Sequence, residues 1–517
     1  MRKYALSIDC GTQSVRALLF DNVGTLCAVE KVSFEPYFSK KPGFAEQYVD
    51  VFWNSACEAC LKLKEAEIDK WKKISGISVT TQRDTVINVD RYGKPLRSAI
   101  IWLDQRMAKC EKKLPFIYNL ELSLAGMSKS MKVVRKKVKA NWIKENEPEI
   151  WNNTYKYLLL SGYFIYKLTG KFVDSIGSQI GHIPFDYRQR RWPKSHKNLK
   201  WYLFGIEEKK LPQLIEPGEV IGKVTKKAAE DMGLKEGTLV IASGSDKGCE
   251  TLGNGCMNLD TISVSFGTTA TVQTTSKKYF EPIRFMPCYP AAIPGYYNPE
   301  IEIFRGYWMI SWFKKEFCSQ EIYKSIEKNI STEDLLNDKL SGVPPGCNGL
   351  ILQPYWGAGL KIPEARGAVI GFGDIHTKYH LYRSIIEGIN YALYEGIERI
   401  QKKSKIPIRK VIAAGGGSQS NAICQITADM FNIKLLRVQT YETSGLGAAI
   451  NVFVGTGVYK SYEEAVKNMV HYKNEFIPND TNTQIYNEIY NRVYKRMYRS
   501  LRKMYKELQH ITNYPEE

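Results

Sequence analysis

The sequence predicts an α/β protein made of two similar domains that face each other across a cleft. Segments typical of strands alternate with segments typical of helices along all 517 residues, a pattern that favours the α/β class. A chain of this length is long for one hydrophobic core, so two or more domains are expected. A β-hairpin of one design occurs over residues 4–20 and again over 261–275, which indicates an internal duplication.

The composition is that of a globular protein without a membrane partner. Hydrophobic residues make up 44% of the chain and charged residues 25%, enough for ordinary cores. No apolar run is long enough to span a bilayer, and the N-terminus has no signal-peptide layout, so we expect a cytoplasmic location. The eleven scattered cysteines then indicate reduced thiols. Cys57 and Cys60 form a CxxC without a second ligand pair nearby, so no zinc site is expected there.

The net charge of +19 raises the question of nucleic-acid binding. Lysines and arginines are spread along the chain, and the densest run, Lys132–Lys139, contains three valines and is typical of a solvated helix face. No zinc finger or paired-aromatic RNA-binding motif occurs. We therefore expect no nucleic-acid partner, and a basic surface also suits a protein whose ligands are anionic phosphates.

The first hairpin carries groups that suit a phosphate and a metal ion. The apolar run Tyr4–Ile8 ends on Asp9, the small polar turn Gly11–Ser14 follows, and a second apolar run covers Val15–Phe20. The turn offers free backbone N–H groups and two hydroxyls beside one carboxylate. Phosphate oxygens accept hydrogen bonds from such donors, and metal ions take oxygen ligands. A strand-end turn capped by the aspartate is the alternative.

Three further polar clusters follow apolar β-runs, which is where α/β folds place their ligands. These clusters are Thr80–Thr85, Ser243–Gly248 and Ala414–Asn421. The last contains three consecutive glycines and leads into a predicted helix over Ala422–Phe431, so a flat or phosphorylated ligand could approach closely. The second hairpin, Thr261–Thr275, repeats the design of the first with its own Gly-Thr-Thr turn.

Gln82, Arg83 and Asp84 offer both donors and acceptors, which suits a polyhydroxylated ligand better than a nucleotide. Trp102, Asp104, Gln105 and Arg106 extend the same character a little further along the chain. A buried ion-pair network, such as Arg83 with Asp104, is the alternative interpretation.

Asp246 stands among glycines and serines at the end of a predicted strand, with Lys247 beside it. A carboxylate at such a place in an interdomain cleft could take a proton from a hydroxyl. An Asx-turn is the alternative. We place the domain junction within Val240–Gly255, which gives an N-terminal domain over 1–250 and a C-terminal domain over 251–517.

The segment Ile485–Leu508 is predicted to be a helix because one tyrosine- and leucine-rich stripe recurs at spacings of three and four residues. The stripe is expected to pack onto a domain face. A basic amphipathic helix on a membrane surface is the alternative.

In order along the chain, these motifs resemble those of the FGGY family of carbohydrate kinases, which contains glycerol, xylulose, ribulose and gluconate kinases. The opening SIDCGTQSVRALLFD resembles the phosphate-1 hairpin of that family, and SVSFGTTATV resembles its phosphate-2 hairpin. The segment TTQRDTVINVDRYGKPLRSAIIWLDQR is similar to the substrate segment, and SGSDKGCETLGNG to the segment of the catalytic aspartate. The segments AAGGGSQSNAICQITADM and ETSGLGAAINVFVGTG resemble the adenosine site of the family and its closing helix. The first signature helix resembles KANWIKENEPEIW, and a strand that follows it resembles YKLTGKFVDS. The second signature region resembles GLILQPYWGAGLKIPEARGAVIGFGDIHTKYHLYRSIIEGI.

The resemblance implies two ribonuclease H-like domains of the actin, Hsp70 and sugar-kinase type, with ATP in the cleft between them. It implies that Asp246 is the general base and that Asp9 orients Mg²⁺ through water. Its implied phosphate contacts are Gly11, Thr12, Gln13, Ser14, Arg16, Gly267 and Thr268. Its implied adenosine contacts are Gly415, Gly416 and Asn421, and its implied sugar contacts are Gln82, Arg83, Asp84 and Asp104.

The chain departs from the family patterns at the substrate segment. Gln-Arg-Asp at 82–84 replaces the Gln-Arg-Glu typical of glycerol kinases, and the Met-His of many xylulokinases is also missing there. The tyrosine and phenylalanine of the glycerol pocket align with Val134 and Thr271, so a small triol would lose its apolar wall. We therefore expect a sugar or polyol of four to six carbons, with a ketopentose such as xylulose as the leading candidate. The segment 362–364 replaces a usual Asp-Pro, so its turn is expected to differ.

Other functions stay open from the sequence. The missing substrate aromatics would also fit a catalytically idle nucleotide-binding sensor, although the presence of Asp9 and Asp246 argues against it. A glycerol kinase is a further alternative on the same fold. A homodimer has no signature in the sequence and is left open as well.

Overall fold

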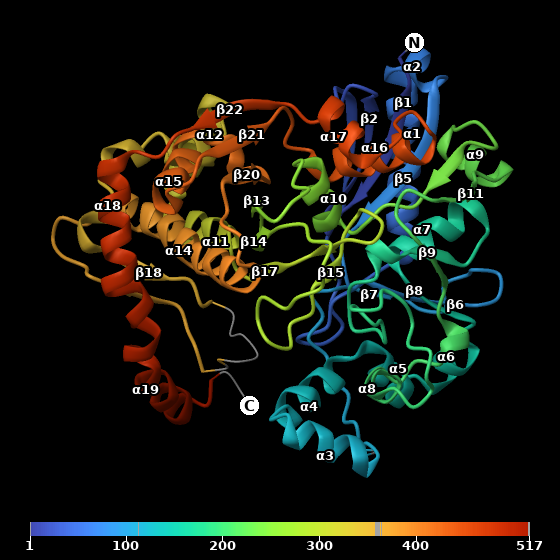
Figure 1. Ribbon diagram of the computed structural model, residues 1–517, viewed down its shortest axis with the longest axis horizontal. Coiled ribbons are helices and arrows are strands. Elements are labelled where there is room, and N and C mark those ends of the chain that lie inside the picture. The colour runs from blue at the N-terminus through green and yellow to red at the C-terminus, as the bar shows by residue number, and fades with distance from the viewer. Residues whose placement is uncertain (1, 112, 357–361, 363, 515–517) are drawn as a thin grey trace.

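The computed structural model describes residues 2–111, 113–356, 362 and 364–514. Two lobes stand side by side, with the first half of the chain in one and the second half in the other (Figure 1). Within these described residues, each lobe is built on a six-stranded sheet, in the orders β11-β12-β5-β1-β2-β3 and β17-β14-β13-β20-β21-β22. The predicted α/β fold with two similar domains is confirmed. The turn expected to differ around Pro363 falls partly outside the described residues.

The strands β1 and β2 of the N-terminal sheet are buried on both faces, which explains their nearly continuous apolar runs. Alternate residues of its first strand serve different cores: Leu6 and Ile8 pack toward α1, whereas Ala5 packs toward α16. The sheet consists of β1 (Tyr4–Cys10), β2 (Ser14–Asp21), β3 (Leu26–Ser33), β5 (Ile74–Thr81), β11 (Val220–Lys223) and β12 (Leu239–Ile241). Helix α1 spans Val49–Ala66 and contains Cys57 and Cys60.

The C-terminal sheet repeats the pairing of the first. Strand β13 pairs antiparallel with β14 and parallel with β20, just as β1 pairs with β2 and β5. Its strands are β13 (Thr261–Phe266), β14 (Ala270–Gln273), β17 (Glu300–Ile303), β20 (Lys410–Ala414), β21 (Leu435–Val438) and β22 (Tyr472–Phe476). Helices α14 (Lys378–Ser404) and α15 (Asn421–Phe431) pack against one another beside it. The two predicted hairpins are therefore confirmed as equivalent elements of two sheets.

Helices α10 (Asp246–Gly253) and α16 (Thr443–Gly455) lie between the two sheets (Figure 1). Glycines let their backbones touch: a Cβ on Gly253 would stand 2.0 Å from the carbonyl oxygen of Thr443. A Cβ on Gly447 would stand 1.9 Å from the carbonyl oxygen of Cys249. Because α10 begins at Asp246, this contact determines where that carboxylate stands.

The remaining elements complete the two lobes. In the N-terminal lobe they are β4 (Glu46–Gln47), β6 (Val86–Val89), β7 (Ala99–Ile100), β8 (Lys156–Leu159), β9 (Val173–Ser175), β10 (Gln213–Ile215), α2 (Ile68–Trp71), α3 (Phe116–Leu124), α4 (Ser128–Lys137), α5 (Lys139–Asn146), α6 (Pro148–Asn153), α7 (Leu160–Thr169), α8 (Leu199–Phe204) and α9 (Lys226–Met232). In the C-terminal lobe they are β15 (Tyr289–Pro290), β16 (Tyr297–Asn298), β18 (Ile351–Gln353), β19 (Ala368–Ile370), α11 (Trp308–Phe317), α12 (Ser319–Lys328), α13 (Thr332–Asn337) and α17 (Tyr462–Met469).

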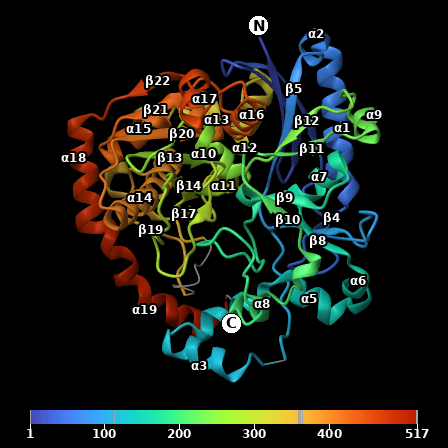
Figure 2. The ribbon, with the colours of Figure 1, turned by 45° about the vertical axis from the view of Figure 1, so that its right-hand side comes forward.

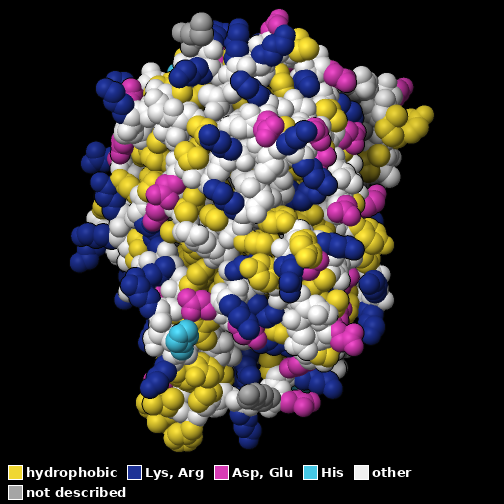
Figure 3. All heavy atoms as spheres, turned by 90° about the vertical axis from the view of Figure 1, so that its right-hand side faces the viewer, with side chains coloured by type: hydrophobic (Ala, Val, Ile, Leu, Met, Phe, Trp, Pro, Cys, Tyr) yellow, Lys and Arg dark blue, Asp and Glu magenta, His cyan; other side chains and the backbone are white. Residues whose placement is uncertain are grey.

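The basic run Lys132–Lys139 is helical, but not as one helix. Helix α4 ends at Lys137, Val138 is extended and fully buried, and α5 begins at Lys139. No residue of α4 is buried, which confirms the predicted solvated face for Lys132–Lys137. The prediction was wrong for Lys139, which is 3% exposed because it pairs with Asp84. Elsewhere too, basic side chains are scattered among acidic ones on the face shown in Figure 3. Among the described helices, none is long and apolar enough to cross a membrane.

The predicted C-terminal helix has three parts: α18 (Asp480–Ile489), a π-helical turn over 490–494 and α19 (Lys495–Thr512) (Figure 2). Tyr486, Tyr490 and Tyr494 are buried, and the ring of Tyr490 stacks 5.9 Å from that of Tyr391 in α14. Leu508 is 47% exposed. The prediction that the whole stripe packs was therefore wrong at its end, where α19 extends beyond the face that α14 offers.

Replacing Gly447 by alanine should force α10 and α16 apart, because the added Cβ would overlap the Cys249 carbonyl group. Overpacking of this kind costs about 1–3 kcal/mol. Urea unfolding of Gly447→Ala should show that loss in the free energy of unfolding. Gly342→Ala is the control, since its Cβ would meet nothing within 4 Å. Equal stability of the two variants would contradict the proposed backbone contact.

Candidate active site

The first hairpin turn places a buried carboxylate at the boundary between the lobes. Strand pairing sets Asp9 opposite Arg16, whose Nη1 lies 3.3 Å from Asp9 Oδ2 and whose Nε lies 3.4 Å from Glu442. Burial raises the pKa of Asp9 to about 7, and the charges of Glu442 and Asp246 add to the increase while Arg16 opposes it. Asp9 is therefore a carboxylate whose charge is incompletely compensated by the protein.

A magnesium ion fits this carboxylate. The described part of the chain holds no group of three or more acidic, histidine or cysteine side chains that could bind a metal ion by themselves. Mg²⁺ at kinase sites is commonly bound by one or two carboxylates, with substrate phosphates and waters as its other ligands. A single buried aspartate beside a turn that is predicted to bind phosphate matches that donor set.

The loop before α10 presents Asp246. The hydroxyl of Ser243 donates to the carbonyl of Val79 at 2.6 Å, and that of Thr80 donates to the carbonyl of Gly244 at 3.0 Å. Ser245 caps the helix by accepting a hydrogen bond from a backbone N–H in its first turn. The Asp246 side chain remains 33% exposed, and its Oδ1 accepts only a local hydrogen bond, from the N–H of Lys247 at 2.8 Å. The sequence alternative of an Asx-turn is thus replaced by a helix start that leaves the carboxylate accessible.

The phosphate-1 turn and the substrate segment are joined by hydrogen bonds. Thr12 Oγ1 donates to Gln82 Oε1 at 2.8 Å and accepts from Trp102 Nε1 at 2.9 Å. Gln82 is buried, and its Nε2 has no hydrogen-bond partner among the described residues. A buried donor without a partner is costly, and a ligand oxygen is one way to satisfy it.

Arg83 lies beside Asp246, and its partners differ from the one considered in the sequence. Its Nη1 donates to Glu300 Oε1 at 2.9 Å, and its Nε lies 3.7 Å from Asp246 Oδ1. An Arg83–Asp104 pair was therefore the wrong pairing. Asp104 instead accepts from Arg106 and from the backbone N–H of Ala45, and its side chain is 1% exposed. This carboxylate stabilises its own segment, and the structure does not bring it to a ligand with Gln82 and Arg83.

Asp84 forms an ion cluster that the sequence did not reveal. Its Oδ2 lies 2.9 Å from Lys139 Nζ and 2.8 Å from His182 Nδ1. Burial favours the neutral acid, but the charges and hydrogen bonds of these two partners outweigh it and hold the pKa of Asp84 well below its ordinary value. His182 is 98 positions away in the chain, so no local pattern could have identified it.

Two tyrosines add aromatic surface beside Arg83. The guanidinium of Arg83 lies 5.1 Å from the ring centre of Tyr289, and that ring lies 5.6 Å from the ring of Tyr187. Aromatic rings beside hydrogen-bonding side chains are suited to the apolar and polar faces of a sugar. The sequence did not identify either tyrosine, because both lie in irregular segments or short strands.

The phosphate-2 turn and the glycine loop meet at the end of the C-terminal sheet. Ser265 pairs with Ala414 in the parallel register of β13 and β20, so the turn at Gly267–Thr268 and the loop from Gly415 leave the sheet together. Gly415 has φ of +78°, and a Cβ there would lie 3.0 Å from the Phe266 backbone, whereas a Cβ on Gly416 would meet nothing within 4 Å. The loop is thus packed on one side and open on the other.

Arg437 fixes the glycine loop from the next strand. Its Nη2 donates to Asn421 Oδ1 at 2.8 Å, and its Nη1 donates to the carbonyl of Ser418 at 2.9 Å. Asn421, predicted to contact adenosine, is thereby oriented at the start of α15. No pattern in the sequence identified Arg437, which lies in a strand outside every motif.

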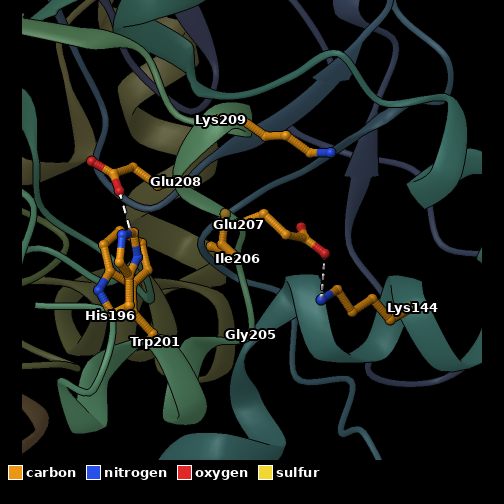
Figure 4. Close-up of a pocket in the computed structure, with 8 residues that line it drawn as sticks. All are labelled: Lys144, His196, Trp201, Gly205, Ile206, Glu207, Glu208 and Lys209. Carbon is orange, nitrogen blue, oxygen red and sulfur yellow. Dashed lines mark hydrogen bonds and ion pairs between the residues drawn. The ribbon is translucent and has the colours of Figure 1, made fainter.

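The hollow shown in Figure 4 lies outside these elements, in the N-terminal lobe. It has a volume of about 740 Å³ and is lined by Lys144, His196, Trp201, Gly205, Ile206, Glu207, Glu208 and Lys209. Lys144 lies 3.2 Å from Glu207, and His196 lies 3.9 Å from Glu208. Because none of these lining residues belongs to the hairpin turns, the substrate segment or α10, we do not assign the catalytic site to this hollow.

Two α/β domains with equivalent glycine turns, and a helix-borne carboxylate between them, form the two-domain fold of the actin, Hsp70 and sugar-kinase type. Two family models match most of the chain. The N-terminal domain of the FGGY family of carbohydrate kinases covers residues 4–253, and the C-terminal domain of that family covers 262–455. The chain belongs to the FGGY family and is an ATP-dependent sugar kinase, as the sequence resemblance predicted.

Named relatives agree on the family and differ in substrate. A xylulose kinase from Lactococcus lactis is 29% identical over 494 residues, which cover 94% of each chain. A gluconokinase from Bacillus subtilis is 26% identical over 481 residues, which cover 91% of each chain. The solved xylulose kinase of Lactobacillus acidophilus superimposes with a TM-score of 0.81 at 22% identity, covering 98% of this chain and 99% of that one, and therefore shows the same fold.

Replacing Asp84 by asparagine should destabilise the N-terminal lobe, because Lys139 is only 3% exposed and would lose its charged partner. Breaking a buried ion pair from one side costs about 3 kcal/mol. Since the pKa of Asp84 is lowered by folding, its stabilising effect is present above its ordinary pKa and is lost as the pH falls through its folded value. Urea unfolding should thus separate wild type and variant at pH 7, and the difference should shrink below about pH 4.

The exposed pair of Glu58 and Lys62, at 2.6 Å on α1, offers a control for this measurement. Glu58→Gln should change the free energy of unfolding by less than about 1 kcal/mol. A loss at Asp84→Asn no larger than at Glu58→Gln would show that the Asp84 cluster is not a stabilising feature.

Replacing Arg437 by methionine should loosen the loop that holds Ser418 and Asn421. Since the loop is predicted to bind adenosine, the KM for ATP should rise about tenfold while the KM for the sugar stays within twofold. Lys434→Met, which removes an exposed cation that pairs with Glu475 nearby, is the charge-matched control. A parallel rise of both KM values would contradict a specific role in the nucleotide site.

Proposed function

We propose that this kinase transfers the γ-phosphoryl group of ATP to a hydroxyl of a neutral sugar or polyol of four to six carbons, with a ketopentose such as xylulose as the leading candidate. The observation that carries the proposal is the placement of Asp246. Its accessible carboxylate begins α10 between the two glycine turns and lies beside Arg83 of the substrate segment. A hydroxyl held by Gln82 and Arg83 would have its proton acceptor and the phosphate turns within one site.

In the proposed mechanism, Asp246 accepts the proton of the substrate hydroxyl as its oxygen attacks the γ-phosphorus of ATP. The transition state of phosphoryl transfer is loose, with charge spread over the phosphoryl oxygens, so positioning and electrostatics do most of the work. Backbone N–H groups and hydroxyls of the turns at Gly11–Ser14 and Gly267–Thr268 would hold the phosphates, with Arg16 behind the first turn. Asp9 would hold Mg²⁺, which supplies positive charge to the phosphate oxygens when bound.

The polar lining of the site supports a polyhydroxylated substrate. Thr271, at the position of a glycerol-pocket aromatic residue, is 1% exposed and pairs in register with Glu302 of β17. Together with Gln82 and Asp84, these side chains make the surroundings of the substrate segment strongly hydrogen-bonding. This lining favours a sugar over glycerol, which was the alternative on the same fold.

The pairing of charges supports a neutral substrate over an aldonate such as gluconate. At Asp246 and the substrate segment, the cations Arg83, Lys139 and Lys247 lie 2.9 Å, 2.9 Å and 3.3 Å from the carboxylates of Glu300, Asp84 and Glu250. A bound carboxylate would have to compete with these protein carboxylates for its counter-charge. The relatives named xylulose kinase are in line with a neutral ketose, and the gluconokinases provide the contrasting case.

A coupled ADP-release assay with Mg-ATP tests the proposal. The panel should include xylulose, ribulose, fuculose, rhamnulose, erythritol, ribitol, xylitol, gluconate and glycerol. We expect one neutral sugar or polyol to exceed all others in kcat/KM. Gluconate as the best substrate would overturn the proposed neutrality, and ATP binding without any sugar-dependent turnover would favour an idle nucleotide-binding sensor.

Replacing Asp246 by asparagine should abolish most turnover, because the amide cannot accept the hydroxyl proton. General-base catalysis contributes roughly 100- to 10,000-fold, so kcat should fall by that factor. ATP affinity, measured by calorimetry, should change little. Turnover close to that of the wild type would contradict the assigned role.

A further inference from the structure

Arg83 connects the two domains at the proposed base. It belongs to the N-terminal family domain, whereas Glu300 lies on β17 of the C-terminal one. Arg83 Nη1 donates to Glu300 Oε1 at 2.9 Å, and Nη2 lies 2.9 Å from Glu300 Oε2. The Arg83 side chain is 15% exposed and that of Glu300 is 2% exposed, so the pair is shielded from solvent. Its charge attraction is correspondingly stronger than that of a surface pair.

Glu300 is held in place from the helix that carries Asp246. Gln273 of β14 donates its side-chain amide to Glu300 Oε2, and Thr251 of α10 donates its hydroxyl to Gln273 Oε1. Strand pairing sets Gln273 directly opposite Glu300. A continuous hydrogen-bonded path thus runs from α10 through Gln273 to Glu300, which fixes Glu300 relative to Asp246.

Glu300 and Asp246 compete for the same guanidinium. The closest approach of Arg83 to Asp246 is 3.7 Å, which exceeds hydrogen-bond distance, whereas its contact with Glu300 is a hydrogen bond of 2.9 Å. A carboxylate that accepts a close charge-assisted hydrogen bond holds its electron pairs tightly and is a poorer proton acceptor. Glu300 therefore draws Arg83 away from a contact that would occupy Asp246.

We propose that Glu300 is a positioning residue: it holds Arg83 across the domain boundary, so that Arg83 can orient the sugar while Asp246 remains free to accept the proton. The inference rests on the proposed function of Asp246. It adds to that function a residue that contacts neither the transferred proton nor the transferred phosphoryl group. Lys247 cannot take the place of Arg83, because it is engaged by Glu250 at 3.3 Å and by Ser265 Oγ at 2.6 Å.

Kinetics of Glu300→Gln tests this role. In this variant the side chain at position 300 keeps its shape but loses its charge, so Arg83 should form a hydrogen bond with Asp246 instead. The kcat should fall about 10- to 100-fold, a part of the effect of losing a general base. The KM for the sugar should rise, because Arg83 leaves its position, and the KM for ATP should stay within twofold.

Glu321→Gln is the matched control. Glu321 is a buried carboxylate of α12 that pairs with Lys378 at 2.7 Å, so the change removes the charge of a shielded ion pair outside the proposed site. It should keep kcat within about threefold of the wild type, while Glu300→Asp, which keeps the charge, should recover part of the loss. Equal effects of Glu300→Gln and Glu321→Gln on kcat would overturn the inference.

A crystal structure of Glu300→Gln provides a second test that does not depend on activity. The distance between Arg83 and Asp246 should shorten from 3.7 Å to a direct hydrogen bond. An unchanged distance would overturn the inference even if activity were lost. If the wild-type protein phosphorylated no sugar but the contact still shortened, the proposed function would fail while the charge competition at Asp246 would stand.

Discussion

The backbone contact between α10 and α16 is the constraint on which the site depends. Gly253 and Gly447 allow the two helices to approach until carbonyl groups occupy the space of a side chain. Helix α16 also packs against β1 and β5, so α10 is positioned against the sheet that carries Asp9 and the substrate segment. Because α10 begins with Asp246, a close helix contact, rather than any property of the aspartate itself, places the proposed base between the two domains.

Most charged side chains of the proposed site are paired with a charge of opposite sign. Arg83 pairs with Glu300 of the other domain, Asp84 with Lys139 and His182, and Lys247 with Glu250. Asp9 is the exception: burial raises its pKa to about 7, and Arg16 compensates only part of its charge. Buried carboxylates of this kind cost stability, and such costs are common where a protein keeps a group ready for a ligand. The incomplete compensation at Asp9 is therefore the physical reason why we propose this carboxylate as a magnesium ligand.

The sequence predicted features that depend on neighbouring residues and missed those that depend on tertiary contacts. Both hairpins, the helix after the glycine loop and the exposed face of α4 follow local patterns of polarity and turn residues, and the structure confirms them. Glu300, His182 and Arg437 act on residues far away in the chain, so no spacing could reveal them. The predicted pairing of Arg83 with Asp104 was also wrong. Arg106, which lies two positions from Asp104, donates a hydrogen bond to the Asp104 carboxylate instead. The exposed end of the tyrosine stripe shows that helical spacing identifies a face but not the length over which a neighbour covers it.

The overall charge and the local charge of this kinase serve different ligands. A net charge of +19 raises the local concentration of anions, which favours the encounter with ATP. At Asp246 and the substrate segment, in contrast, Arg83, Lys139 and Lys247 are matched by protein carboxylates. On the proposed function, an aldonate would have to break an existing ion pair to gain one, so a preference for a neutral ketose would need no clash in shape. In the role proposed for Glu300, one contact would both occupy Arg83 and leave Asp246 free, which would couple the charge of the substrate to the chemistry of the base.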